Sequence, residues 1–268
     1  MKYKLLALDL DETLLNAEHK ISPRNAAALR RAVEQGILVT IATGRMFSST
    51  LPYARELQID LPLITYHGAL IKKAGGEVFR HSPLPFEKAL EILQIGTEEG
   101  LHLQVYVDDR LYAQEENDYT RYYQTIAPVS LGMVGNLPAF LAAEQREPTK
   151  LTIIDLEKRR LRRIQQQLQE KYGEDLFVLQ SRPNFLEITA AEATKGQALR
   201  FLGEKEGIAP REMVAFGDSY NDVDMLKFAG LGVAVANAPQ DVQAAADAIA
   251  GSNTEDGVAR FIEEHLLG

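Results

Sequence analysis

Short apolar runs alternate with amphipathic stretches in the first and last thirds of this chain. Period-3.6 patterns predict helices and short continuous apolar runs predict buried strands. Predicted strands are 3–10, 37–42, 62–66, 213–216 and 231–235; predicted helices are 23–35, 48–57, 195–207, 222–228, 239–246 and 258–267. This order predicts an α/β fold, a doubly wound, Rossmann-like parallel sheet with helices on both faces.

The middle third follows a different pattern. A helix is predicted at 86–99, and two strands, 103–107 and 111–114, are separated only by the turn Asp108-Asp109. Such closely spaced strands indicate antiparallel pairing. A strand at 151–154, a long helix, and strands near 177 and 186 follow. We therefore expect an α+β cap, residues 83–188, inserted into a catalytic core formed by residues 1–82 and 189–268.

Composition excludes several classes of protein. The chain has 268 residues, 46% of them hydrophobic and 25% charged, which is ordinary for a globular protein. It has no cysteine, so disulfides, thiolate metal sites and cysteine nucleophiles are excluded. We expect a cytoplasmic protein without a membrane partner, because no apolar run reaches the length of a membrane span or resembles a secretory leader. A net charge of −9 argues against nonspecific nucleic-acid binding.

Two carboxylates stand where the first apolar strand ends. Asp9 and Asp11 follow the run Leu5-Leu6-Ala7-Leu8, and the carboxyl ends of strands carry the ligand sites of open α/β sheets. Two acids so close repel each other unless a cation or a shared proton intervenes. Bound Mg²⁺ would neutralise the pair and attract a phosphorylated ligand.

Four ordered segments carry a family resemblance. They are Asp9-Leu10-Asp11-Glu12-Thr13-Leu14-Leu15, Ala42-Thr43-Gly44-Arg45, Thr194-Lys195-Gly196 and Gly217-Asp218-Ser219-Tyr220-Asn221-Asp222. Together they resemble the motifs of the haloacid dehalogenase (HAD) superfamily, and in particular its Cof-type (HAD-IIB) phosphatases, which carry an α+β cap between the second and third motifs. The resemblance covers the whole chain, including Ser252-Asn253 and Asp256-Gly257-Val258.

The resemblance implies a role for each matched position. Asp9 would attack phosphorus and form an aspartyl-phosphate, and Asp11 would act first as general acid and then as general base. The implied catalytic residues are Asp9, Asp11, Thr43 and Lys195; the implied substrate-binding residues are Thr43, Gly44, Lys195 and Asn221; the implied Mg²⁺ ligands are Asp9, Asp11 (through its backbone carbonyl), Asp218 and Asp222. Asp222 is equally compatible with a helix N-cap, and Arg45 with substrate contact or an ion pair.

Two positions depart from the family pattern. Many relatives have glycine where this chain has Glu12. Relatives also commonly show Asn-Gly-Ala where this chain reads His67-Gly68-Ala69. His67 is therefore a further candidate for substrate binding, with a plain structural turn as the alternative.

The sequence thus predicts a Mg²⁺-dependent phosphatase for a small phosphorylated metabolite such as a sugar phosphate, acting as a monomer or homodimer. Six cap residues are candidates for setting specificity: Tyr106, Asp108, Asp109, Arg110, Tyr112 and Arg182. A phosphomutase or phosphotransferase would use the same intermediate. A receiver-like signalling module would place its acidic residues on different strands, and a non-enzymatic sensor of a phosphorylated ligand would not need every catalytic position.

Overall fold

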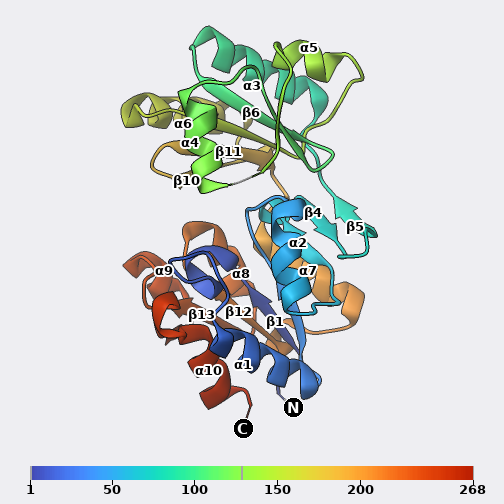
Figure 1. Ribbon diagram of the computed structural model, residues 1–268, viewed down its shortest axis with the longest axis vertical. Helices are drawn as coiled ribbons and strands as arrows, with labels where there is room; N and C mark the ends of the chain where they lie inside the picture. The colour runs from blue at the N-terminus through green and yellow to red at the C-terminus, as the bar shows by residue number, and fades with distance from the viewer. Residues whose placement is uncertain (1, 128, 268) are drawn as a thin grey trace. The chain divides into compact units, whose positions relative to one another are not determined.

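The computed structural model describes residues 2–127 and 129–267, which form two compact units. The core unit comprises residues 2–80 and 194–267, and the cap unit comprises residues 81–193 apart from residue 128. The sequence places the two boundaries after residues 82 and 188. The second boundary lies further along because residues 189 and 190 still belong to a cap strand. Each unit has its own sheet (Figure 1).

A five-stranded parallel sheet organises the core unit. Its order is β14 (Ala248–Ala250), β13 (Leu231–Val235), β12 (Met213–Gly217), β1 (Leu5–Leu8), β2 (Leu38–Ile41). In the register, Leu8 lies opposite both Phe216 and Ile41. Strands β12, β1 and β2 therefore end nearly level with one another, and the residues that follow them meet at one edge of the sheet.

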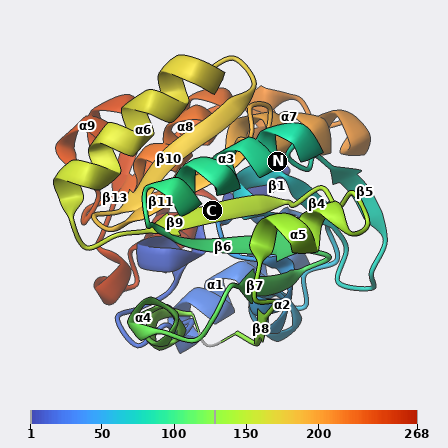
Figure 2. The same cartoon turned by 90° about the horizontal axis from the view of Figure 1, so that it is seen from above.

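Helices cover both faces of this sheet, as the sequence predicts. The helices are α1 (Pro23–Glu34), α2 (Phe47–Glu56), α7 (Lys195–Glu206), α8 (Val223–Phe228), α9 (Gln240–Ala245) and α10 (Gly257–His265). Figure 2 shows α1 on one side of β1 and α7 and α8 on the other. Ser22 caps α1 by accepting a hydrogen bond from the Asn25 N–H, and Pro23 is its first residue.

The strand predicted at 62–66 is not a regular member of the parallel sheet. β3 (Leu63–Thr65) touches that sheet through a parallel bridge between Ala42 and Ile64, and it pairs antiparallel with β4 (Leu70–Lys72). β5 (Val78–His81) completes this three-stranded sheet. β4 and β5 were not predicted, because both are short and flank the turn that contains Gly75 and Gly76.

The cap unit is a six-stranded sheet with helices. In chain order its elements are α3 (Phe86–Glu98), β6 (His102–Val107), β7 (Arg110–Ala113), α4 (Asp118–Ile126), β8 (Leu131–Met133), α5 (Leu137–Ala142), β9 (Lys150–Ile154), α6 (Lys158–Tyr172), β10 (Leu176–Arg182) and β11 (Phe185–Ala190). The strand order is β10-β11-β9-β6-β7-β8. The predicted antiparallel pair, β6 with β7, is present; β8 and α5 were not predicted.

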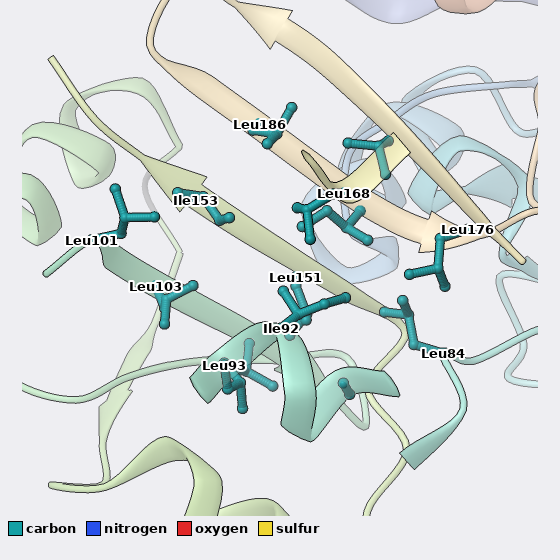
Figure 3. Packing of buried hydrophobic residues seen from close by; sticks show 14 of the residues in the cluster. Leu84, Ile92, Leu93, Leu101, Leu103, Leu151, Ile153, Leu168, Leu176 and Leu186 are labelled. Carbon is teal, nitrogen blue, oxygen red and sulfur yellow. The ribbon is translucent and has the colours of Figure 1, made fainter. Parts of the chain in front are cut away.

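Strand periodicity decides which side chains form the cap core. Leu103, Val105 and Val107 alternate along β6 and join one buried cluster with Leu151 and Ile153 of β9. Figure 3 shows Ile92 and Leu93 of α3 in the same cluster. The intervening residues of these strands, such as Gln104 and Thr152, are polar although they are buried. Helices α3, α5 and α6 pack on the apolar face of the cap sheet, and its other face carries more polar side chains and contacts α4 through Tyr123.

Candidate active site

Asp9 lies directly after β1 at the carboxyl edge of the core sheet. Its N–H donates to the Phe216 carbonyl at 3.0 Å, so the parallel ladder fixes its backbone. The following residues, Leu10–Leu14, form a tight turn in which Glu12 has a positive φ of 59°. That turn carries the chain away from the sheet and leaves Asp9 buried, with 5% of its surface exposed.

Lys195 joins Asp9 to Asp222. It is the first residue of α7, and its Nζ donates to Asp9 Oδ1 and to Asp222 Oδ1, each at 2.6 Å. A cation is unfavourable at the positive end of a helix, and Lys195 is only 1% exposed. The two carboxylates therefore hold the ammonium group in a place that would otherwise exclude it.

The balance of charge in this cluster shifts its pKa values. Burial raises the pKa of Asp9 well above its ordinary value; Lys195 opposes that shift, while Asp222, Asp218 and Asp11 add to it. Burial opposes the charge of Lys195, but Asp222 and Asp9 outweigh it and its pKa is raised. Burial, followed by the charge of Asp222, raises the pKa of Asp218 to about 7. The single ammonium group of Lys195 therefore balances only part of the negative charge of the carboxylates in this cluster.

The loop after β12 brings the remaining acids to the same place. Asp218 Oδ1 accepts a hydrogen bond from the Thr13 hydroxyl at 2.8 Å. Asp222 Oδ2 accepts from the N–H groups of Asp218 and Ser219, at 3.1 and 2.9 Å. The sequence left open whether Asp222 is a metal ligand or the N-cap of the next helix. Its side chain makes no capping hydrogen bond to α8; one oxygen binds Lys195 and the other binds the preceding loop.

This acidic cluster can hold a divalent metal ion. One carboxylate oxygen from each of Asp9, Asp218 and Asp222 lies within 4.8 Å of the others, and all three residues are buried. Carboxylate oxygens are the ligands that hard divalent cations prefer. A single lysine faces three acids, so an added 2+ charge fits both the donor set and the raised pKa values. The side chain of Asp11 does not belong to this group.

Asp11 is instead held by Arg45. The guanidinium donates from Nε to Asp11 Oδ2 at 2.7 Å and from Nη2 to Oδ1 at 2.5 Å. Arg45 also donates to the Tyr53 hydroxyl at 3.3 Å, and His19 Nδ1 lies 3.7 Å from Asp11 Oδ1. Of the two roles considered for Arg45, the structure shows an ion pair, and its partner is the predicted acid–base residue.

The predicted phosphate-binding residues follow β2. Thr43 is buried, and its hydroxyl accepts a hydrogen bond from the Arg45 N–H at 3.2 Å. His67, from the turn Tyr66–Gly68, lies against Gly44 and contacts Asn221, whose Nδ2 is 3.1 Å from His67 Nδ1. Most of the predicted core site residues thus follow β1, β2, β3 or β12, and Lys195 reaches the same place from the start of α7.

Some contacts that support the site were not predicted from the sequence, although Gly196 and Asn253 lie in segments that carry the family resemblance. Asn237 Nδ2 donates to the Glu12 carbonyl at 2.8 Å, and Asn253 Nδ2 donates to the Leu15 carbonyl at 2.8 Å. The Gly196 N–H donates to Asp224 Oδ2 at 2.9 Å. These residues are far apart in sequence and share no spacing, so only the fold reveals them.

The cap residues predicted to set specificity occupy different settings. Tyr106 is buried, and its hydroxyl pairs with that of Tyr123 at 2.6 Å. Tyr112 packs on Phe140 beside the cap core. Asp108 and Asp109 form a left-handed turn with φ of 52° and 56°. Tyr112 thus contributes to packing, and these cap residues do not share one kind of environment.

Comparison with known proteins identifies the family. The model of haloacid dehalogenase-like hydrolases matches residues 6–262. The chain is 30% identical to the pyridoxal phosphate phosphatase of Escherichia coli over 275 residues, covering 100% of both chains. A haloacid dehalogenase-like hydrolase from Bacteroides thetaiotaomicron is 32% identical, with a TM-score of 0.88, and the match covers 98% of this chain and 99% of that one. A sugar phosphatase of HAD subclass IIB is 25% identical, with a TM-score of 0.85 over 99% and 100% of the two chains.

The chain therefore belongs to the haloacid dehalogenase-like hydrolases, in the Cof-type group that the sequence predicts, and it is an enzyme of the phosphatase class. None of the helices in residues 2–127 and 129–267 has the length and apolar content needed to span a bilayer.

Proposed function

We propose that this protein is a Mg²⁺-dependent phosphatase that hydrolyses a small phosphomonoester through an aspartyl-phosphate at Asp9. The observation that carries the proposal is the bridge from Lys195 Nζ to Asp9 and Asp222, at 2.6 Å each, beside Asp218. It combines a nucleophile, a fixed cation and a metal-binding acid set at one sheet edge. In-line phosphoryl transfer requires a nucleophile, a cation and a bound metal ion arranged together in this way.

Asp9, Asp218 and Asp222 would hold the ion, together with the backbone carbonyl of Asp11 that the family resemblance implies. A bound Mg²⁺ would neutralise the phosphate oxygens that face Asp9. Thr13 orients Asp218 through its hydroxyl, and the amides of residues 218 and 219 orient Asp222. These contacts fix the acids before substrate arrives, which lowers the reorganisation needed during the reaction.

In the first step, Asp9 attacks phosphorus. Lys195 occupies Oδ1, so we assign the attack to Oδ2. The new bond joins Asp9 Oδ2 to phosphorus, the bond from phosphorus to the leaving oxygen breaks, and Asp11 gives that oxygen a proton. Thr43 and Gly44 would donate hydrogen bonds to the phosphoryl oxygens.

In the second step, water restores Asp9. Asp11, now a carboxylate, takes a proton from the water as its oxygen bonds to phosphorus, and the bond from phosphorus to Asp9 breaks to release inorganic phosphate. Asp11 must leave Arg45 to carry a proton, because the guanidinium engages both of its oxygens in the structure. Arg45 can thus pair in this way with the carboxylate form of Asp11, which the mechanism requires between the two steps.

The substrate we propose is a small phosphorylated metabolite, with sugar phosphates and vitamin phosphates as the first classes to test. The relatives support this range, since one is a sugar phosphatase and another a pyridoxal phosphate phosphatase. We assign selection of the leaving group to the cap unit, and we propose that the enzyme works in the cytoplasm as a monomer or homodimer, without a nucleic-acid or membrane partner.

The test is phosphate release from a panel of sugar phosphates, nucleotides and vitamin phosphates, with Mg²⁺ and with chelator. We expect release that needs Mg²⁺ and is lost in Asp9→Asn. Asp11→Asn should slow both steps. Activity in Asp9→Asn close to that of the wild type would contradict the mechanism. Transfer of the phosphoryl group to a sugar hydroxyl instead of water would identify a phosphomutase, and binding without turnover would identify a sensor.

A further inference from the structure

The backbone of the turn Tyr66–Gly68 contacts two segments of the site. The Tyr66 N–H donates to the Arg45 carbonyl at 2.9 Å, and the His67 N–H donates to the Thr43 carbonyl at 3.0 Å. Gly68 has a φ of 115°, and a β-carbon there would lie 2.4 Å from the Thr194 carbonyl oxygen. The turn therefore packs against the loop of Thr43 and against the start of the helix that carries Lys195.

His67 occupies the centre of this turn in a costly conformation. Its φ is 61°, in the left-handed region that non-glycine residues rarely adopt. Its side chain is nevertheless buried, with 3% exposed. Strained backbone persists where the surrounding structure requires it, and such residues cluster at functional sites. The strain here places an imidazole ring inside the site.

The His67 ring contacts Gly44 on one side and Asn221 on the other. A β-carbon on Gly44 would lie only 2.3 Å from His67 Cε1, so the ring fills the space over Gly44 that any larger residue would need. On its other side, Nδ1 accepts a hydrogen bond from Asn221 Nδ2 at 3.1 Å, which places the ring proton on Nε2. His67 thus joins the Thr43-Gly44 loop to the loop that carries Asp218 and Asp222.

We propose that His67 is a positioning residue that holds the Asn221 amide beside the phosphate-binding Thr43-Gly44 loop. The proposal rests on the proposed function, because it assigns Asn221 to the phosphate. It differs from the sequence-based expectation, in which His67 itself touches substrate. Asn221 adjoins Asp222, the partner of Lys195, so a fixed Asn221 also steadies the end of that ion-pair network.

Two variants of His67 separate positioning from a backbone role. His67→Gly removes the ring and relieves the strain, since glycine adopts positive φ at no steric cost. His67→Ala removes the ring and keeps the strain. If only the backbone matters, His67→Gly should keep wild-type activity. We expect instead that it lowers kcat/KM about tenfold, the value of one lost hydrogen bond, while its melting temperature equals or exceeds that of the wild type.

A double-mutant cycle tests whether His67 acts through Asn221. The four proteins are wild type, His67→Gly, Asn221→Ala and the double variant, with phosphomonoester turnover and the Kd of inorganic phosphate in the presence of Mg²⁺ as the two readouts. We expect the double variant to match Asn221→Ala within about twofold, because removing the support of an absent group has no further effect.

Three outcomes would overturn the proposal. The first is a wild-type kcat/KM in His67→Gly. The second is a double variant whose loss of activity equals the product of the losses in the two single variants. The third is an equal affinity for phosphate in all four proteins. If the wild type turns over no phosphomonoester, the proposed function fails, and the phosphate affinities still decide whether His67 positions Asn221.

Discussion

At the scale of single residues, the site depends on backbone conformations as well as on acids. Glu12 stands between Asp11 and Thr13 with φ of 59° and ψ of 5°. Its carbonyl accepts a hydrogen bond from Asn237, so the turn is held by its backbone. The side chain is exposed. Glutamate is therefore strained at this position without a contact that requires its carboxylate.

Replacing Glu12 should stabilise the fold. Glu12→Gly relieves a left-handed conformation that costs a non-glycine residue about 1 kcal/mol or more, and the greater freedom of the unfolded chain offsets part of the gain. We expect a net gain of about 0.5 kcal/mol in the free energy of unfolding, measured by urea denaturation. The control is Glu12→Ala, which removes the charge and keeps the strain. Equal stability of the two variants would show that strain is not the cause.

Single residues also show which parts of the site could be predicted from the sequence alone. Asp9, Asp11, Thr43, Lys195 and Asp218 could be chosen because each follows a strand or opens a helix within a recognisable motif. An ion pair of Arg45 was one of two alternatives, but its partner Asp11 was not predicted, since a side chain's partner depends on rotamers that no spacing encodes. The contact between His67 and Asn221 joins residues 154 positions apart, so it required the fold.

At the scale of elements, strong patterns were predicted well and short edge elements were not. α1, with its Ser22 cap and Pro23 start, and the apolar strand β12 fall within about two residues of their predicted ends. β8 was missed because it is only 3 residues long, and α5 because its 6 residues are all apolar and show no helical periodicity. Such short elements form through their neighbours in the sheet and leave little periodicity in the sequence.

The cap strand β6 carries a buried histidine, His102, that should make the folded protein less stable in acid. Burial lowers the pKa of His102 from 6.5 to about 4. The ring stacks on Tyr119 with centroids 5.3 Å apart. In the folded protein His102 stays neutral while the unfolded chain takes up a proton, so its contribution is fully present above pH 6.5 and is lost as the pH falls toward 4.

We therefore expect His102 alone to lower the free energy of unfolding by up to about 1 kcal/mol per pH unit as the pH falls from 6.5 toward 4. The measurement is the free energy of unfolding between pH 7 and pH 4.5 for wild type and His102→Gln. The variant cannot take up this proton, so its stability should fall less steeply. Parallel curves would mean that His102 remains accessible to protons in the folded state.

At the scale of the whole molecule, two units are built from one chain by insertion. The change from alternating strands and helices to closely spaced strands predicted the insertion. The chain divides into compact units after residues 80 and 193, whereas the polar threonine at 189 was interpreted as the start of a linker. In the structure Thr189 is buried and paired within β11.

The acidic cluster of the core should make the stability of the protein depend on metal. Asp218→Asn removes one buried negative charge and keeps an oxygen that can accept from Thr13. Without metal this variant should melt at or above the wild-type temperature, because repulsion among the carboxylates falls. With Mg²⁺ the wild type should gain stability, by about 2.7 kcal/mol at a hundredfold excess over Kd, and the variant should gain much less.

Calorimetric melting with Mg²⁺ and with chelator measures this difference. A matched control is Asp60→Asn, which removes an exposed acid of the same unit outside the cluster; it should behave as the wild type does. If Mg²⁺ leaves the melting temperature of the wild type unchanged, the cluster is not a magnesium site.

The central claim is that Asp9 becomes phosphorylated during turnover. The most direct measurement is mass spectrometry of the peptide that contains Asp9, taken from protein quenched in acid during turnover of its best substrate with Mg²⁺. Asp11→Asn serves as a second sample, because slow hydrolysis would favour accumulation. We expect the added mass of one phosphoryl group on Asp9, and we expect that mass to be absent in Asp9→Asn and with chelator. Turnover with no phosphoryl group on Asp9 in either sample, or with the group on another residue, would contradict it.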